Sequence, residues 1–191
     1  MKKLNRAVII IARIVEVFMW VGCALSAVIT GLSAAGKFSL LRFFTDVDTA
    51  NAQSLTSGSF NLLVRFENGV PSRGAYVIFF LTLVFTFALM AMCARNVYLI
   101  FKTSEGRTSF AKGATPFQPD NIRMVREIGI FLIAIPVVQF VMSIVARIAL
   151  GPDVCETSMG TQNLFVGLVV LALSQYFAYG MKLENEVDGL V

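Results

Sequence analysis

The sequence predicts an all-α protein, an integral membrane four-helix bundle with a small extracytoplasmic loop that offers a candidate β-hairpin. Hydrophobic residues make up 57% of the 191 residues and charged residues only 15%, whereas roughly a quarter of the residues are charged in an ordinary soluble domain. The apolar residues form long runs and do not recur at helical or strand period, which is typical of bilayer-spanning segments. We therefore expect residues 1–191 to form a single membrane domain surrounded by the lipid bilayer.

Four apolar runs are the candidate membrane spans. Each is long enough to cross a hydrocarbon core of about 30 Å at a rise of 1.5 Å per residue. The predicted spans cover residues 14–36, 75–94, 128–146 and 164–181.

The first span also resembles a signal peptide, because basic residues precede it and LSAAG offers small residues for cleavage. However, its apolar run exceeds the roughly 7–15 residues of a typical signal-peptide core, and Arg13 and Glu16 interrupt its start. We therefore expect a retained span.

The distribution of Lys and Arg in the short flanks predicts the orientation of the helices. The outer loop 37–74 holds four basic residues spread over its length, and the loop 151–163 holds none. The N-terminal flank and the middle loop with its helix ends contain more basic residues, namely Lys2, Lys3, Arg6, Arg13, Arg95, Lys102, Arg107, Lys112, Arg123 and Arg126. We expect a multi-pass protein of the cell membrane with both termini and the loop 102–118 in the cytoplasm.

The outer loop contains a candidate strand over residues 60–66, FNLLVRF, in which Phe60, Leu62, Val64 and Phe66 alternate on one face. Residues 53–56 are the candidate partner strand. A lone hairpin is marginally stable in water, so we expect it to rest on the membrane surface or on a partner subunit. The loop is either a partly ordered connector or a cap that senses a ligand or docks a partner.

Polar residues near the predicted cytoplasmic ends of the spans suggest a cluster. Arg13 and Glu16 share a face of the first helix, and Glu16 is expected to pair with Arg13 or Arg95. The candidate polar cluster comprises Arg13, Glu16, Arg95, Gln175 and Tyr179. The alternative is that these side chains snorkel to the interface or close helix ends.

Three further features concern packing within the spans and the outer loops. Gln139, three residues after Pro136, is expected to form an interhelical hydrogen bond. Small residues at four-residue spacing predict a close-packing face on the first helix, namely Cys23, Ala27, Gly31 and Ala35. Cys155 is expected outside the membrane as a free thiol, with an intermolecular disulfide as the alternative.

Several kinds of chemistry are not encoded. The chain has no histidine, which excludes histidine-based catalysis and histidine-ligated metals. It has neither a GxxxxGK[ST] nor a GxGxxG motif. We therefore expect no enzyme activity, no cofactor and no metal. The net charge of +4 lies at the ends of the apolar runs, so direct nucleic-acid binding is not expected.

Two charged segments are candidate partner-binding sites on the cytoplasmic side. Pro119 and Asp120 suit the first turn of a helix that carries Arg123 and Arg126 before the third span. The tail after the fourth span is acidic, with Glu184, Glu186 and Asp188. The alternatives are contact of the arginines with anionic lipid headgroups and a solvated helix end for the acidic tail.

The segments TPFQPDNIRMVREIG (115–129) and YGMKLENEVDGLV (179–191) resemble parts of a bacterial family of small four-span membrane proteins of unknown function. Members are commonly encoded beside a small Xre-type helix-turn-helix regulator. The resemblance implies a membrane partner of such a DNA-binding protein. The family has no established catalytic or ligand residue, so no site residue is implied.

The sequence therefore predicts a membrane sensor or partner of a cytoplasmic helix-turn-helix protein. One alternative is a transporter-like or immunity-type protein that handles a lipid or peptide. Another is a structural subunit of a membrane homo-oligomer.

Overall fold

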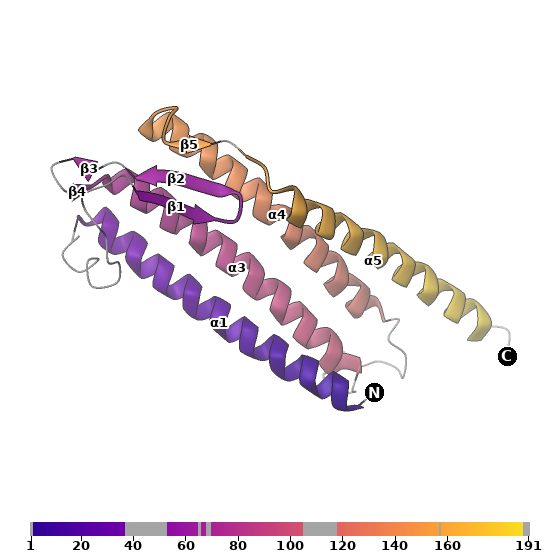
Figure 1. The fold of residues 1–191 in the computed structure, drawn as a ribbon. Helices are drawn as coiled ribbons and strands as arrows, with labels where there is room; N and C mark the ends of the chain where they lie inside the picture. The colour runs from indigo at the N-terminus through magenta and orange to yellow at the C-terminus, as the bar shows by residue number, and fades with distance from the viewer. Residues whose placement is uncertain are drawn as a thin grey trace. The chain divides into compact units, whose positions relative to one another are not determined.

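The computed structural model describes residues 2–36, 53–64, 66–67, 70–104, 118–156 and 158–188, and most of these residues are helical. Four long helices dominate the described chain (Figure 1), namely α1 (Lys2–Ala34), α3 (Arg73–Ser104), α4 (Pro119–Leu150) and α5 (Thr161–Asp188). Most of the predicted cytoplasmic loop 102–118 lies outside the described residues.

By length and composition, four helices of the described chain are able to cross a membrane, over Asn5–Ala34, Arg73–Thr103, Pro119–Leu150 and Thr161–Glu184. The predicted helical class and the four long apolar helices are confirmed. The helices extend beyond the predicted apolar runs, since α1 begins at Lys2 and α4 at Pro119. Hydropathy marks the part of a helix that suits lipid, whereas Lys, Arg and Glu continue the helix readily outside it.

The chain divides into two compact units. The first unit comprises Met1–Met19, Leu89–Ala134 and Gln162–Val191, and the second comprises Trp20–Ala88 and Ile135–Thr161. The division runs through the interior of α1, α3 and α4 rather than through a loop.

The second unit contains all the described strands. β1 (Gln53–Ser57) pairs antiparallel with β2 (Phe60–Val64), and β5 (Cys155–Glu156) joins the other edge of β2. Figure 1 shows β1 and β2 as adjacent arrows. A separate short pair is formed by β3 (Phe66–Glu67) and β4 (Val70–Pro71). The predicted strand 60–66 is therefore divided, because β2 ends at Val64 and Phe66 pairs with Pro71 in a different sheet.

The core of the second unit lies under β2. Phe60, Leu62 and Val64 point inward and are at most 1% exposed, and the ring centroids of Phe60 and Phe79 are 6.1 Å apart. The core cluster also includes Tyr76 from α3, Met142 and Ala146 from α4, and Cys155 from β5. The hairpin thus packs on helices of its own chain, whereas the sequence suggested the membrane surface or a partner subunit. These helices cover the apolar face of β2, which a two-stranded hairpin cannot bury by itself.

In the first unit, α4 and α5 approach each other closely at two glycines. A β-carbon added at Gly167 would lie 2.9 Å from the carbonyl oxygen of Gly129 and 2.7 Å from Cγ1 of Ile133. A β-carbon added at Gly31, in the small-residue face predicted on α1, would meet nothing within 4 Å. Close backbone packing therefore occurs at α4 and α5, and Gly31 does not take part in such a contact within the described residues.

Candidate functional site

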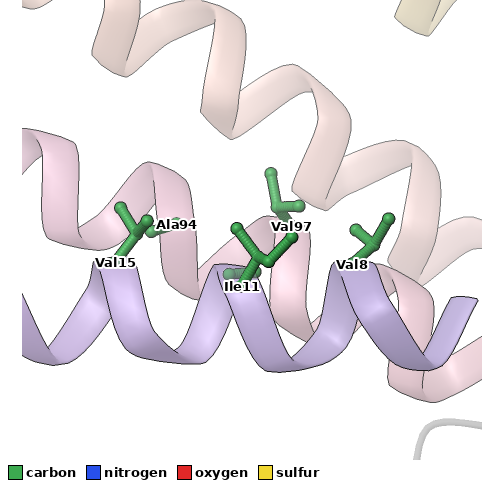
Figure 2. Close-up of a pocket in the computed structure, with 6 residues that line it drawn as sticks. Val8, Ile11, Val15, Ala94 and Val97 are labelled. Atoms are coloured by element: carbon green, nitrogen blue, oxygen red, sulfur yellow. The ribbon is translucent and has the colours of Figure 1, made fainter. Parts of the chain in front are cut away.

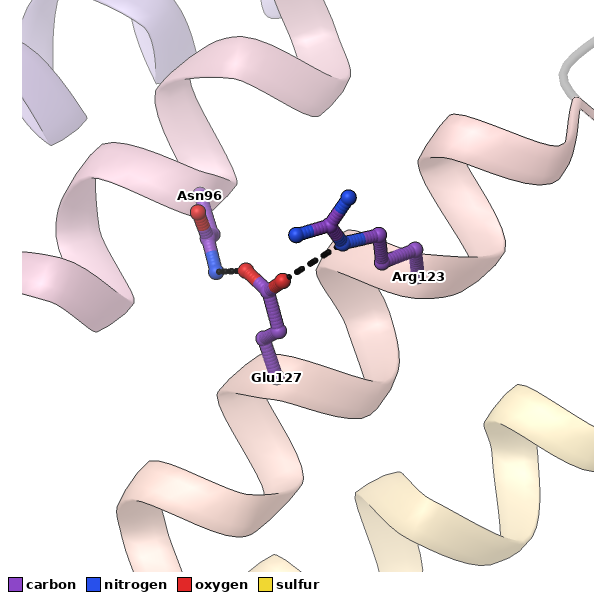
Figure 3. Close-up of polar contacts among 3 residues, drawn as sticks. All are labelled: Asn96, Arg123 and Glu127. Carbon is purple, nitrogen blue, oxygen red and sulfur yellow. Dashed lines mark hydrogen bonds and ion pairs between the residues drawn. The ribbon is translucent and has the colours of Figure 1, made fainter.

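The best-defined polar site of the first unit joins α3 to the beginning of α4 (Figure 3). Asn96 donates a hydrogen bond from Nδ2 to Oε2 of Glu127 at 3.0 Å, and Nε of Arg123 lies 2.9 Å from Oε1 of the same carboxylate. Asn96 is buried and Glu127 is half-buried, whereas the side chain of Arg123 is 78% exposed. A carboxylate held between a buried amide and an exposed guanidinium connects the surface of α4 to α3.

The sequence of α4 explains why these side chains lie together. Pro119 occupies the first helical position, where its missing N–H costs nothing, and the carbonyl of Gln118 accepts the N–H of Ile122 at 3.1 Å. Arg123 and Glu127 are four residues apart and therefore lie on one face. Glu127 lies toward α3, where the buried Asn96 side chain donates to its carboxylate.

A charge placed at Asn96 should disrupt this site. We expect Asn96→Asp to lower the free energy of unfolding by about 1–3 kcal/mol at neutral pH, because it removes the donor and sets two carboxylates against each other. The loss should shrink at acidic pH, where one carboxylate takes up a proton. Thermal unfolding in detergent across a pH series measures this effect. Asn96→Leu is the control, and a loss with the same pH dependence in both variants would contradict the Asn96–Glu127 contact.

A second polar group of the first unit lies on α1 and α3. Nη1 of Arg13 is 2.7 Å from Oε2 of Glu16, whose side chain is only 7% exposed. The sequence left Arg13 and Arg95 as possible partners of Glu16, and in the structure Glu16 forms its ion pair with Arg13. The guanidinium carbon of Arg13 also lies 5.3 Å from the centroid of the Tyr98 ring, and Nζ of Lys102 lies at the same distance from it. Both cations are within the range of a cation–π interaction.

The other members of the predicted polar cluster are not joined to this group. Arg95, Gln175 and Tyr179 are exposed, and among the described residues none of them forms a hydrogen bond or ion pair with Glu16. The side chain of Ser174 on α5 is fully buried, so the next residue, Gln175, turns outward by about 100°. Sequence spacing placed Gln175 and Tyr179 on one face of α5 but could not show where that face points.

Three of the five predicted partner-binding residues, Arg123, Arg126 and Glu186, have exposed side chains. Arg123 and Arg126 are exposed on the first turns of α4. On α5, Glu186 is exposed and Glu184 is half-buried, and the helix continues to Asp188, whose side chain lies outside the described residues.

Gln139 of α4 takes a different partner from the one expected. Its Oε1 accepts a hydrogen bond from Oγ of Ser59 at 2.8 Å, in the turn between β1 and β2, and Oγ of Ser158 donates to the Ser59 carbonyl at 2.8 Å. Gly58 adopts φ 61°, and a β-carbon there would lie 3.1 Å from the Gln139 amide. Gln139 therefore binds the hairpin turn and not another helix.

Cys155 is a free thiol that is only 4% exposed in the second unit. Burial raises its pKa above the ordinary value, Glu156 adds to the increase, and Arg147 opposes it. The folded chain therefore keeps the neutral thiol, which is the unreactive form. This burial disfavours the intermolecular disulfide that the sequence left open.

We expect alkylation of Cys155 in the folded protein to be slower than in the denatured protein by more than about tenfold, because the thiol must open to solvent and ionise. The rate should increase as pH rises. Mass spectrometry of maleimide-treated protein measures it, and a thiol introduced by Met159→Cys is the control, since Met159 is 42% exposed. Equal labelling at positions 155 and 159 would refute the burial of Cys155.

The first unit also has an apolar pocket between α1 and α3, of about 260 Å³. Figure 2 shows the side chains that line it, which come from Val8, Ile11, Ala12, Val15, Ala94 and Val97. The lining offers no polar group for chemistry, so the pocket suits an apolar chain and not a reaction.

Comparison with known proteins supplies no further assignment of these residues. No protein-family model matches the sequence, and neither the curated proteins nor the solved structures yield a significant match.

Proposed function

We propose that the chain is a multi-pass protein of the cell membrane that senses a condition at the membrane or outside it and binds a cytoplasmic regulator, with both termini in the cytoplasm. The regulator is a helix-turn-helix DNA-binding protein, as the resemblance of residues 115–129 and 179–191 to the four-span family implies. In this proposal the chain is neither an enzyme nor itself a nucleic-acid-binding protein.

One observation carries the proposal. Two charged helix ends belong to the first unit: the start of α4, with exposed Arg123 and Arg126 beside Asp120 and Glu127, and the acidic end of α5, with Glu184 and exposed Glu186. A basic DNA-binding domain suits the acidic end of α5, since complementary charge guides association. Because Glu127 links Arg123 to Asn96 on α3, a partner bound at α4 has a direct route of contact to a spanning helix.

Copurification from membranes tests the docking. We expect full-length protein to retain a helix-turn-helix protein, and deletion of residues 182–191 or the double substitution Glu184→Lys with Glu186→Lys to release it. Glu156→Lys is the matched control, because Glu156 is an exposed carboxylate of β5 in the other unit. If deletion of the tail leaves every cytoplasmic partner bound, tail docking is wrong.

Thiol labelling tests the orientation. In a background without the three native cysteines, we expect a membrane-impermeant maleimide applied to whole cells to label Met159→Cys but not Lys182→Cys. Both positions are exposed in the structure. Labelling of Lys182→Cys alone would reverse the proposed orientation.

The apolar pocket between α1 and α3 favours a second candidate function, the handling of a lipid or hydrophobic peptide. Filling it with Ala94→Leu should abolish such a function and leave the retention of a helix-turn-helix partner unchanged. Loss of the partner in this variant would instead assign the pocket to the docking function.

A further inference from the structure

Tyr98 in the first unit holds two cationic side chains around one ring. The guanidinium carbon of Arg13 on α1 and Nζ of Lys102 on α3 each lie 5.3 Å from its centroid. A third cation follows the same stripe of α3, because Arg95, Tyr98 and Lys102 have the spacing i, i+3, i+7 that places residues on one helix face.

The described part of the chain provides little negative charge to balance these groups. Glu16 bonds to Arg13 and is its ion-pair partner at 2.7 Å. Among the described residues, no carboxylate contacts Arg95 or Lys102. Arg13, Arg95, Lys102 and Glu16 together carry a charge of +2 within the described part of α1 and α3.

These cations also belong to two helices that are apolar enough to cross a membrane. Arg13 belongs to the candidate span Asn5–Ala34, and Arg95 and Lys102 belong to Arg73–Thr103. The side chain of Arg13 is 57% exposed, and apolar residues near it on α1 are exposed as well, since Ile10, Ile14 and Val17 are 53%, 50% and 50% exposed. An exposed cation among apolar side chains near a span end is energetically unfavourable unless an anion binds to it.

We propose that Arg13, Arg95 and Lys102 bind the phosphate group of an anionic phospholipid, with an acyl chain lying along the exposed apolar face of α1 at Val17. A guanidinium presents a fork of N–H donors that matches phosphate oxygens, and an ammonium adds a point charge. Tyr98 holds Arg13 and Lys102 in place through its ring. The ligand is a lipid and not free phosphate, because exposed aliphatic side chains of α1 border Arg13.

Native mass spectrometry of the full chain in detergent tests the site, with phosphatidylglycerol, phosphatidylcholine and inorganic phosphate added separately. We expect preferential retention of phosphatidylglycerol, and binding about fivefold weaker in Lys102→Gln, which removes one basic residue. Tyr98→Leu should weaken it at least as much, whereas Tyr98→Phe should retain binding because it keeps the ring. Arg13 is left intact, since its loss would leave the buried Glu16 carboxylate without its partner.

Lys182→Gln is the matched control, because Lys182 is an exposed lysine on another helix, α5, and it should bind phosphatidylglycerol as the parent does. Circular dichroism establishes that each variant remains helical. If Tyr98→Leu unfolds, the binding of phosphatidylglycerol by Lys102→Gln alone tests the proposal. Equal binding of the two phospholipids, an equal loss in Lys182→Gln and Lys102→Gln, or displacement of phosphatidylglycerol by inorganic phosphate would overturn the proposal.

Discussion

Leu62→Ala should lower the free energy of unfolding by about 2–5 kcal/mol, the range for truncating a fully buried leucine. Leu62 is 0% exposed and lies in the core of the second unit with Phe60, Tyr76 and Phe79. It is also the residue of β2 that pairs with Cys155 of β5. The cavity left by the truncated side chain should therefore loosen both the hairpin and β5, the strand that carries the Cys155 thiol.

The adjacent leucine provides a control of identical chemistry. Leu63 is 39% exposed on the other face of β2, and Leu63→Ala should change stability by well under half of the Leu62→Ala loss because little packing is removed. Denaturant titration in detergent measures the stability, and the rate of maleimide labelling at Cys155 reports opening. Equal losses in the two variants would mean that the hairpin does not pack on α3 and α4 in the folded protein.

Gly167→Val should also lower the free energy of unfolding strongly, by about 1–3 kcal/mol or more, because it overpacks the contact between α4 and α5. The β-carbon alone would lie 2.9 Å from the carbonyl oxygen of Gly129 and 3.1 Å from the backbone nitrogen of Ile133. Backbone atoms cannot move aside as a flexible side chain can, so α5 must separate from α4. Thermal unfolding in detergent measures the effect.

Gly31→Val is the matched control for helix propensity. A β-carbon at Gly31 meets nothing within 4 Å, so this substitution carries the same change in side chain without the clash. It should leave stability near the parent value, since valine is a better helix former than glycine. A destabilisation at Gly31 equal to that at Gly167 would instead place a close helix contact at both positions.

The candidate site was predictable only where both partners belong to one helix. Arg13 and Glu16 are three residues apart, so their pairing follows from helix geometry. The contact between Asn96 and Glu127 joins α3 to α4, and it depends on how each helix is rotated about its own axis. The failure of Gln175 and Tyr179 to join Glu16 has the same cause.

The sequence by itself determined the all-helical class, the four apolar helices and the start of α4 at Pro119, because hydropathy, charge and proline chemistry act on neighbouring residues. Only the tertiary structure decided that the β1–β2 turn binds Gln139, that β5 extends the hairpin, and that Gly129 and Gly167 form the close helix crossing. Each of these contacts joins residues far apart in the chain. Local pattern does not encode the rotation and register that bring such residues together, since packing of whole elements sets them.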